Sequence, residues 1–172
     1  MTGRFARITT SHPHPIDMRR LLPTLLLASL AACGGGDPAQ AGYDALGSGD
    51  YAAAASSFTE ALAGTQGEKR TDLTLQLCQA LAHTDAGASV AKMKELDAAT
   101  ELRVQDYNVV VSELKGAGEF VAATDVLKLA TAAFPGDEKL VELIQDVGDA
   151  AKNAGDSDAL SALKGLGYVG ND

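Results

Sequence analysis

The sequence predicts an all-α protein in which helix–turn–helix pairs follow a short N-terminal signal segment. Three observations support this fold class. No stretch alternates apolar and polar residues with a period of two well enough to compete with a helix. Glycine and proline breaks divide residues 37–165 into segments of helical length. Within these segments, apolar residues recur at steps of three and four, which is the spacing of one helical face.

The chain before Cys33 divides into two parts. Residues 1–17 show no apolar periodicity, and we expect them to be a disordered extension. Residues 18–32 have the form of an export signal: Met18, two arginines, a leucine-rich stretch and then small residues before Cys33. Translation from Met1 and from Met18 are both open, and the better-formed signal favours Met18.

The residues that end this signal form a lipidation pattern. They are Leu30, Ala31, Ala32 and Cys33. The pattern resembles the lipobox of bacterial lipoproteins, in which the cysteine receives a diacylglyceryl thioether and becomes the new N-terminus. The resemblance implies a covalent lipid on Cys33, with residues 33–36 as lipidated cysteine and glycine tether. Gly34 stands where an aspartate favours inner-membrane retention in that family, so the resemblance implies an outer-membrane anchor facing the periplasm. The alternative is a cytoplasmic protein with an apolar N-terminal helix.

The charge of the chain excludes several classes of partner. The formal net charge is −9, and without residues 1–32 there remain 10 basic and 22 acidic residues, a net charge of −12. Nucleic acids and anionic lipid surfaces both require clustered basic residues, so we expect neither as an electrostatic partner. Attachment to a membrane is therefore expected to depend on the lipid.

Breaks at glycine, proline and aspartate place eight helices in the mature part of the chain. Asp37 is a good capping residue, and Pro38 suits the first turn of a helix because its missing N–H costs no hydrogen bond there. The breaks that follow contain Gly49, Gly64 and Gly67, Asp85, Gly118, Pro135 and Gly155. The predicted helices are 37–47, 50–63, 71–84, 87–99, 104–116, 118–133, 137–153 and 157–165.

Two of these helices share one apolar pattern, in which Tyr51 of the first corresponds to Phe120 of the second. The first carries Tyr51, Ala54, Phe58 and Ala61, and the second carries Phe120, Ala123, Leu127 and Ala130, followed by a closing Pro135. Each set lies on one helical face, with a small residue where a neighbouring helix must come close. The helix before the second set carries its own apolar stripe, which begins at Tyr107. The step from Tyr51 to Phe120 is close to two periods of about 34, and the unit half-way between is degenerate.

A period near 34 with paired helices resembles the tetratricopeptide (TPR) repeat family. The resemblance implies a right-handed superhelix of about four TPR-like helix pairs over residues 37–165, with a concave binding face. The tail, residues 166–172, is expected to pack Leu166 and Tyr168 over an exposed helix end. An unrelated α-hairpin array or a helical bundle is the alternative.

Few residues suggest chemistry. Cys78 and His83 lie on one predicted helix, but their spacing of five does not bring them together on one face. We expect Cys78 to be a core residue and His83 to sit at a helix C-terminus, where the dipole favours it. Asp156 and its neighbours admit a calcium site, but they lack the full loop pattern, and a helix N-cap is the simpler interpretation. We therefore predict no enzymatic activity, no metal and no cofactor apart from the lipid.

The main functional candidate is a polar stripe on the helix 104–116. It consists of Gln105, Asn108, Ser112 and Lys115. In TPR proteins the first helix of each pair lines the groove, so the resemblance implies that these residues contact a protein or peptide partner; a solvated helix face is the alternative. The expected function is a non-enzymatic interaction scaffold or adaptor. The alternatives are a self-associating structural component of the envelope, an assembly or pilotin-type accessory factor, and an enzyme of unrecognised type.

Overall fold

The computed structural model describes residues 36–170, so the lipobox and the two start sites lie outside the described residues. Residues 36–170 belong to one compact unit and form eight helices and no strand, which confirms the all-α prediction. The helices are α1 (Pro38–Ser48), α2 (Tyr51–Leu62), α3 (Gly67–Ala82), α4 (Ala86–Ala99), α5 (Val104–Gly116), α6 (Phe120–Ala133), α7 (Glu138–Ala154) and α8 (Ser157–Lys164). Except at the start of α3, the predicted boundaries agree to within two residues.

The predicted start of α3 at residue 71 is wrong, because the helix begins at Gly67. The guanidinium of Arg70 donates hydrogen bonds to the backbone carbonyls of Leu62 and Thr65, each at 3.2 Å. These carbonyls lie at and just after the end of α2, where the helix leaves acceptors without partners of its own. The contact ties the first turn of α3 to α2 and lets it form despite one glycine in the preceding loop and another, Gly67, at its first position.

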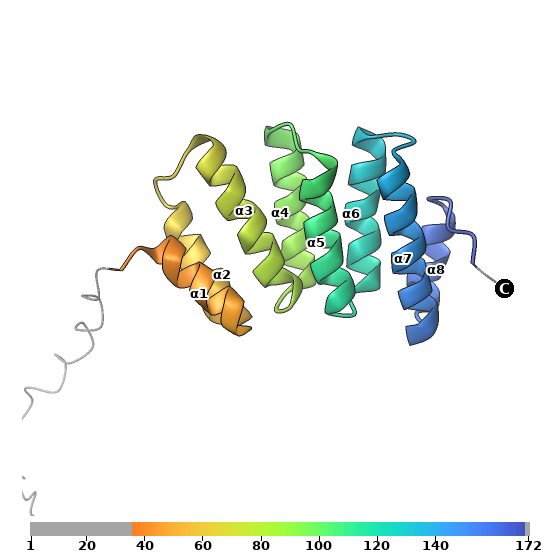
Figure 1. The fold of residues 1–172 in the computed structure, drawn as a ribbon, viewed down its shortest axis with the longest axis horizontal. Helices are drawn as coiled ribbons and strands as arrows, with labels where there is room; N and C mark the ends of the chain where they lie inside the picture. The colour runs from red at the N-terminus through yellow and green to blue at the C-terminus, as the bar shows by residue number, and fades with distance from the viewer. Residues whose placement is uncertain (1–35, 171–172) are drawn as a thin grey trace, which may run out of the picture. The chain divides into compact units, whose positions relative to one another are not determined.

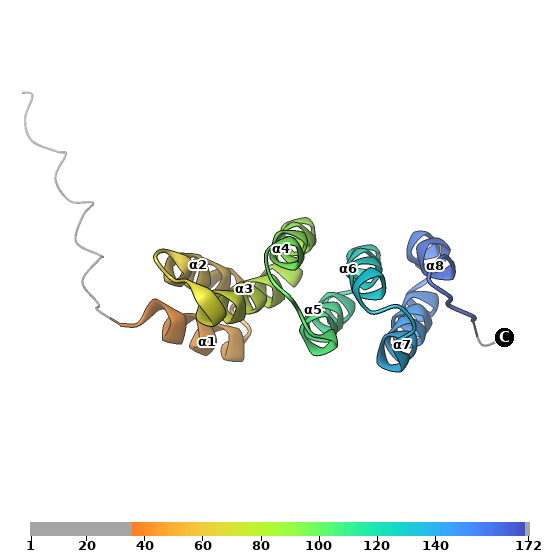
Figure 2. The same ribbon diagram turned by 90° about the horizontal axis from the view of Figure 1, so that it is seen from above.

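The helices form consecutive antiparallel hairpins arranged in two layers (Figure 1). Seen from above, α1, α5 and α7 lie on one side of the row, and α2, α4, α6 and α8 lie on the other (Figure 2). From α3 to α6, each helix packs against its hairpin partner and against the helix two places further along, as in the α3–α5 and α4–α6 pairs. The N-terminal hairpin contacts the rest of the unit chiefly through the packing of α2 on α3.

The core of the described unit falls into two clusters that meet at α3. The smaller cluster contains Ala39, Ala54 and Phe58 together with Leu73, Leu77 and Ala80 of α3. The larger cluster contains Leu75, Cys78 and Ala82 from the other side of α3 and extends through α4 to α8. Because α3 is buried on two faces, it is the helix that joins the N-terminal hairpin to the remaining array.

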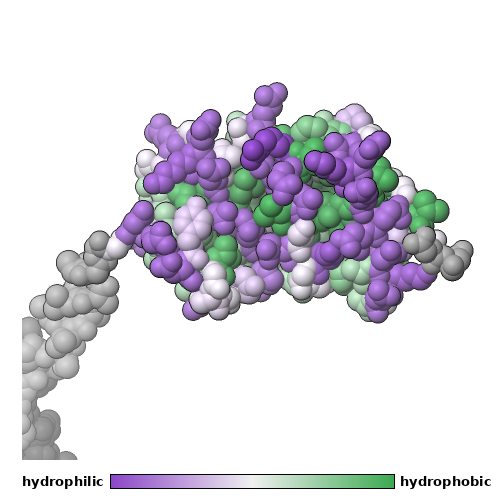
Figure 3. Space-filling view, in the orientation of Figure 1, coloured by the Kyte–Doolittle hydropathy of each residue, from purple (hydrophilic) through white to green (hydrophobic). Residues whose placement is uncertain are grey.

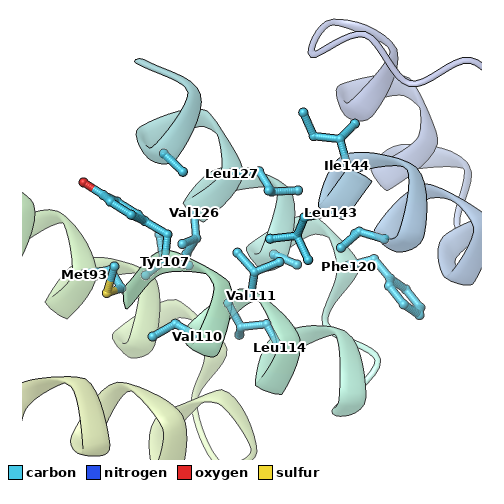
Figure 4. Packing of buried hydrophobic residues seen from close by; sticks show 14 of the residues in the cluster. Met93, Tyr107, Val110, Val111, Leu114, Phe120, Val126, Leu127, Leu143 and Ile144 are labelled. Carbon is cyan, nitrogen blue, oxygen red and sulfur yellow. The ribbon is translucent and has the colours of Figure 1, made fainter. Parts of the chain in front are cut away.

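Large apolar side chains fill the centre of the larger cluster (Figure 4). Tyr107, Val110, Val111 and Leu114 of α5 are at most 1% exposed. They meet Met93 of α4, Val126 and Leu127 of α6, and Leu143 and Ile144 of α7. This close packing of four helices fixes α5 in the middle of the array.

Most of the predicted repeat-packing residues are buried. Ala54, Phe58, Tyr107, Phe120, Ala123, Leu127 and Ala130 are all 9% exposed or less. Tyr51 and Ala61 are half-buried. Pro135 is exposed in the turn after α6, so its prediction as a packing residue is wrong. It ends the helix rather than filling the core, because proline cannot donate the next helical hydrogen bond.

A repeated turn closes three of the four hairpins in residues 36–170. Gly49, Gly118 and Gly155 have φ values of 78°, 79° and 75°, a conformation that glycine adopts without strain. In each hairpin, the residue after the glycine donates its N–H to the carbonyl five residues earlier, at 2.9 Å. This is the Schellman arrangement that ends a helix. The α3–α4 hairpin departs from the pattern and turns through His83 instead.

The tail after α8 folds back onto α7. Tyr168 is 6% exposed, and its hydroxyl donates to Asp149 at 3.0 Å. Its ring occupies the space beside Gly148, where an added Cβ would lie 2.3 Å from the ring. Burial, with help from the Asp149 hydrogen bond, raises the pKa of Tyr168. The tail therefore packs on the side of α7 around Gly148, and the expectation that Tyr168 covers an exposed helix end is wrong.

Candidate partner-binding groove

A groove crosses the first helices of successive hairpins. One cavity of about 470 Å³ lies between α3 and the segment that leads into α5. A second, of about 330 Å³, continues it toward Tyr43 of α1. The two cavities share Asp72, Leu75, Arg103 and Asp106, so they form one continuous groove. The odd-numbered helices face the viewer in Figure 3, where hydrophilic side chains spread over the surface with apolar ones visible between them.

The helical period of α3 builds one wall of this groove. Glu68, Asp72, Leu75, Gln76 and Gln79 line it. Their spacing places them along one face, because residues separated by three, four or seven positions lie one above the other on a helix. Neighbouring positions of the same helix enter the two core clusters. The groove wall is thus held by a helix that packs on two further faces.

The other wall begins with an ion pair between Arg103 and Asp106. The Asp106 carboxylate accepts the backbone N–H of Arg103 at 2.8 Å, its Nη2 at 2.8 Å and its Nε at 3.2 Å. Burial alone would raise the pKa of the Asp106 carboxyl, but the hydrogen bonds and charge of Arg103 outweigh it and lower that pKa. The same hydrogen bond and charge raise the pKa of Arg103. The pair fixes the start of α5 and occupies the guanidinium.

The residues of the predicted polar stripe lie in different surroundings in the structure. Gln105 lines the groove beside Val109. Ser112 donates to the side-chain oxygen of Asn108 at 3.0 Å, and both lie further along α5. Lys115 forms an ion pair with Asp146 of α7. The stripe therefore runs from the α3–α5 groove to the α5–α7 contact, and it brings only Gln105 into the cavity.

Cys78 and His83 occupy separate positions, as their spacing predicted. Cys78 is fully buried in the larger cluster, and burial raises the pKa of its thiol to about 12. The thiol is therefore protonated near neutral pH and is a poor nucleophile. His83 follows the last turn of α3, stacks face to face on Tyr51 with ring centres 3.7 Å apart, and places Nε2 2.8 Å from Glu113 Oε2. It joins α2, α3 and α5 rather than facing a cavity.

A further cavity of about 480 Å³ lies on the other side of the segment before α5, between the ends of α4 and α6. Tyr107 lines it, donates its hydroxyl to Asp97 and packs edge-on against Phe134. Burial, followed by the hydrogen bond to Asp97, raises the pKa of Tyr107. These contacts satisfy the polar atom of a tyrosine that is otherwise part of the core, so they have a structural explanation.

Several groove residues were not singled out from the sequence. They are Tyr43, Glu68, Asp72, Gln76, Gln79, Glu101, Arg103 and Asp106. The spacing of Arg103 and Asp106 at a helix start was a local signal for their ion pair. The glutamines of α3 gave no comparable signal, because exposed polar residues on a helix are usually solvated. Only the packing of α3 beside α5 shows that these residues share a groove.

Comparison with protein-family models, with curated proteins and with solved structures finds no match for this chain.

Within the described residues, no cluster of three or more histidine, cysteine or acidic side chains is arranged to hold a metal ion. Asp156 caps α8, as its sequence context favoured, by accepting the N–H of Ala159 at 2.9 Å. None of the helices between residues 36 and 170 combines the length and apolar character needed to cross a membrane.

Proposed function

We propose that the protein is a membrane-anchored, TPR-like lipoprotein that acts as a non-enzymatic scaffold or adaptor for another protein in the cell envelope. The proposal includes a lipid on Cys33, a position facing the periplasm at the outer membrane, and a right-handed superhelix of four TPR-like pairs. The lipobox pattern supports the anchor. The glycine turns and the packing of each helix on the helix two places further along support the repeat arrangement.

The observation that carries the proposal is the groove across α1, α3 and α5. Each of these is the first helix of a hairpin, and together they present a continuous, solvent-open surface rather than an enclosed pocket. The amide side chains of Gln76, Gln79 and Gln105 offer both hydrogen-bond donors and acceptors there. Such a surface suits an extended polypeptide better than a small substrate.

The proposal is tested by crosslinking on membranes followed by mass spectrometry. The wild type should capture a stoichiometric partner, and a variant with Gln79→Ala and Gln105→Ala should capture markedly less of it at unchanged helicity. Lys94→Ala with Ser161→Ala is the matched control, because both residues are exposed on the even-numbered helices. Equal capture by the groove variant and the wild type would exclude the groove as the partner site.

Two further measurements separate the alternatives. Cys33→Ser should release the protein from the membrane fraction while its binding to the isolated partner is retained. Self-association would instead appear as a mass that rises with concentration in light scattering, with no second protein in the crosslinked product.

A further inference from the structure

The two ends of the groove differ in their chemistry. The end nearer the start of α3 is lined by Glu68, Asp72 and Glu101. The end nearer α1 is lined by Gln76, Gln79 and Gln105, with Tyr43 beside them. Tyr43 is 43% exposed although it is aromatic. The groove thus has an acidic half and an amide half.

The acidic half carries more negative than positive charge. The residues that line the two cavities include one basic residue, Arg103. Asp106 already binds it through three hydrogen bonds. Within residues 36–170, Glu68, Asp72 and Glu101 form no ion pair with any side chain. Asp72 also acts on Arg103 through its charge, but this one guanidinium serves four carboxylates in the cavity, so the acidic half keeps a net negative charge.

The dimensions of the groove fit a short extended segment. Glu68 and Gln79 mark its ends on α3, and eleven residues of helix rise about 16 Å. An extended chain covers that distance with about five residues. The amide half can pair with the peptide groups of such a segment, because amide side chains both donate and accept hydrogen bonds. The acidic half would then meet a side chain two or three residues further along.

We propose that the groove binds an extended segment of a partner protein that places a lysine or arginine side chain among Glu68, Asp72 and Glu101. This inference rests on the proposed scaffold function and specifies the partner's chemistry. Charge complementarity selects a basic segment and disfavours an acidic one, since like charges brought together cost free energy. A metal ion is a poorer occupant, because these carboxylates do not form a metal-binding group in the described part of the chain.

The test uses the full-length protein in nonionic detergent and three synthetic peptide libraries. Each library holds eight-residue peptides with blocked ends, randomised except for one central position fixed as lysine, glutamine or glutamate. The amount bound should be at least about fivefold greater for the lysine library than for either of the others, which corresponds to a partly screened ion pair. The preference should weaken as the salt concentration rises.

Two variants of equal net charge locate the effect. Asp72→Asn with Glu101→Gln removes two groove carboxylates and should abolish the preference for lysine. Glu60→Gln with Glu142→Gln removes two exposed carboxylates outside the groove and should preserve it. The same preference in both variants, no binding of the lysine library, or equal binding of all three libraries would overturn the inference. Free spermidine binding as tightly as the selected lysine peptides would also overturn the assignment to a protein segment.

The outcome is distinguishable from failure of the scaffold function. If Gln79→Ala with Gln105→Ala weakens crosslinking to the partner but the libraries show no preference for lysine, the groove binds a partner and the basic-segment inference is wrong. If neither experiment responds to its groove variant, both proposals fail.

Discussion

In the hairpins α1–α2 and α5–α6, a glycine with a φ of 78° or 79° ends the first helix, and the next residue makes the same hydrogen bond at 2.9 Å. The space between the helices is filled differently. In the first hairpin Gly42 lies against the ring of Phe58, whereas the equivalent positions in the other hairpin hold Val111 and Leu127. The α1–α2 hairpin thus packs a small residue against a large one, whereas the α5–α6 hairpin packs two residues of similar size at the same positions. The turn is therefore set locally, while the packing is set by pairs of residues across the hairpin.

The starts of the two hairpins also differ. Asp37 caps α1 directly by accepting the N–H of Ala39 at 3.0 Å. Asp106 stands at the equivalent position when the two hairpins are aligned on their glycine turns, but α5 begins at Val104, before it. The Asp106 carboxylate therefore lies inside α5, where it binds Arg103. The additional residues at the start of α5 form part of the groove wall, so a shift in the capping position changes the surface available for binding.

The largest expected effect comes from replacing Gly42 of α1 with valine, the residue at the equivalent position in α5. Gly42→Val should lower the free energy of unfolding by about 2 kcal/mol, because overpacking a filled space has this cost. A Cβ at Gly42 would already lie 2.6 Å from the ring of Phe58. The measurement is urea unfolding followed by circular dichroism, with hydrogen exchange to locate the loss in α1 and α2.

Adding Phe58→Leu should bring the Gly42→Val variant back to within about 1 kcal/mol of the wild type, since the pair then matches the α5–α6 hairpin. Gly47→Ala is the control, because no atom lies within 4 Å of a Cβ there. It should be neutral or stabilising by up to about 1 kcal/mol. A double variant as unstable as Gly42→Val alone would contradict the equivalence of the two hairpins.

A smaller loss of stability is expected at the glycine turns of the two hairpins, and it should be the same at both. Gly49→Ala and Gly118→Ala should each destabilise the protein by about 1 kcal/mol, because alanine is strained at positive φ. The two losses should agree within about 0.5 kcal/mol, since the local geometry is the same and context effects at distant sites are small. Hydrogen exchange of the amides in α1 and α5 measures each loss in its own hairpin. A clearly larger loss at Gly118 would show that packing, and not only the turn, depends on the glycine.

The smallest effect concerns acid stability. The pKa of Asp106 is lower in the folded protein than its ordinary value of about 3.9, so its contribution is present above that value and is lost as the pH falls through the lower, folded-state pKa. Relative to Asp106→Asn, the wild type should therefore lose stability as the pH falls below about 5. We expect a difference of about 1 kcal/mol or less at neutral pH, because the Arg103 side chain is 81% exposed.

Stability of both proteins measured by urea unfolding from pH 7 to pH 2.5 checks this expectation. In an Arg103→Gln background the pH dependence of the difference should become smaller, because only the hydrogen bond from the backbone N–H of residue 103 then remains to lower the pKa of Asp106. If it is unchanged there, the Arg103 side chain is not the cause of the pH dependence.

The groove shows where sequence analysis reaches its limit. Gln105 was recognised because its stripe has a helical period, and the structure places it in the cavity. Lys115 belongs to the same stripe, yet it pairs with Asp146 from a helix two places away. Periodicity assigns residues to a face of one helix, but it does not say which helices border that face. Asp72 and Glu101 meet across the groove only because α3 packs beside α5.

The sequence by itself determined the eight helices between residues 36 and 170 and nearly all of their boundaries, because capping aspartates, glycines and prolines act within a few residues of where they stand. The tertiary structure alone decided three other features: the early start of α3, the two-sided burial of that helix between the core clusters, and the groove it forms with α5. The first depends on Arg70 reaching back to the carbonyls of Leu62 and Thr65 at the end of α2. The other two depend on contacts between residues far apart in the chain. Local conformational preferences contain no information about such contacts, which form when the apolar faces of different helices pack against one another.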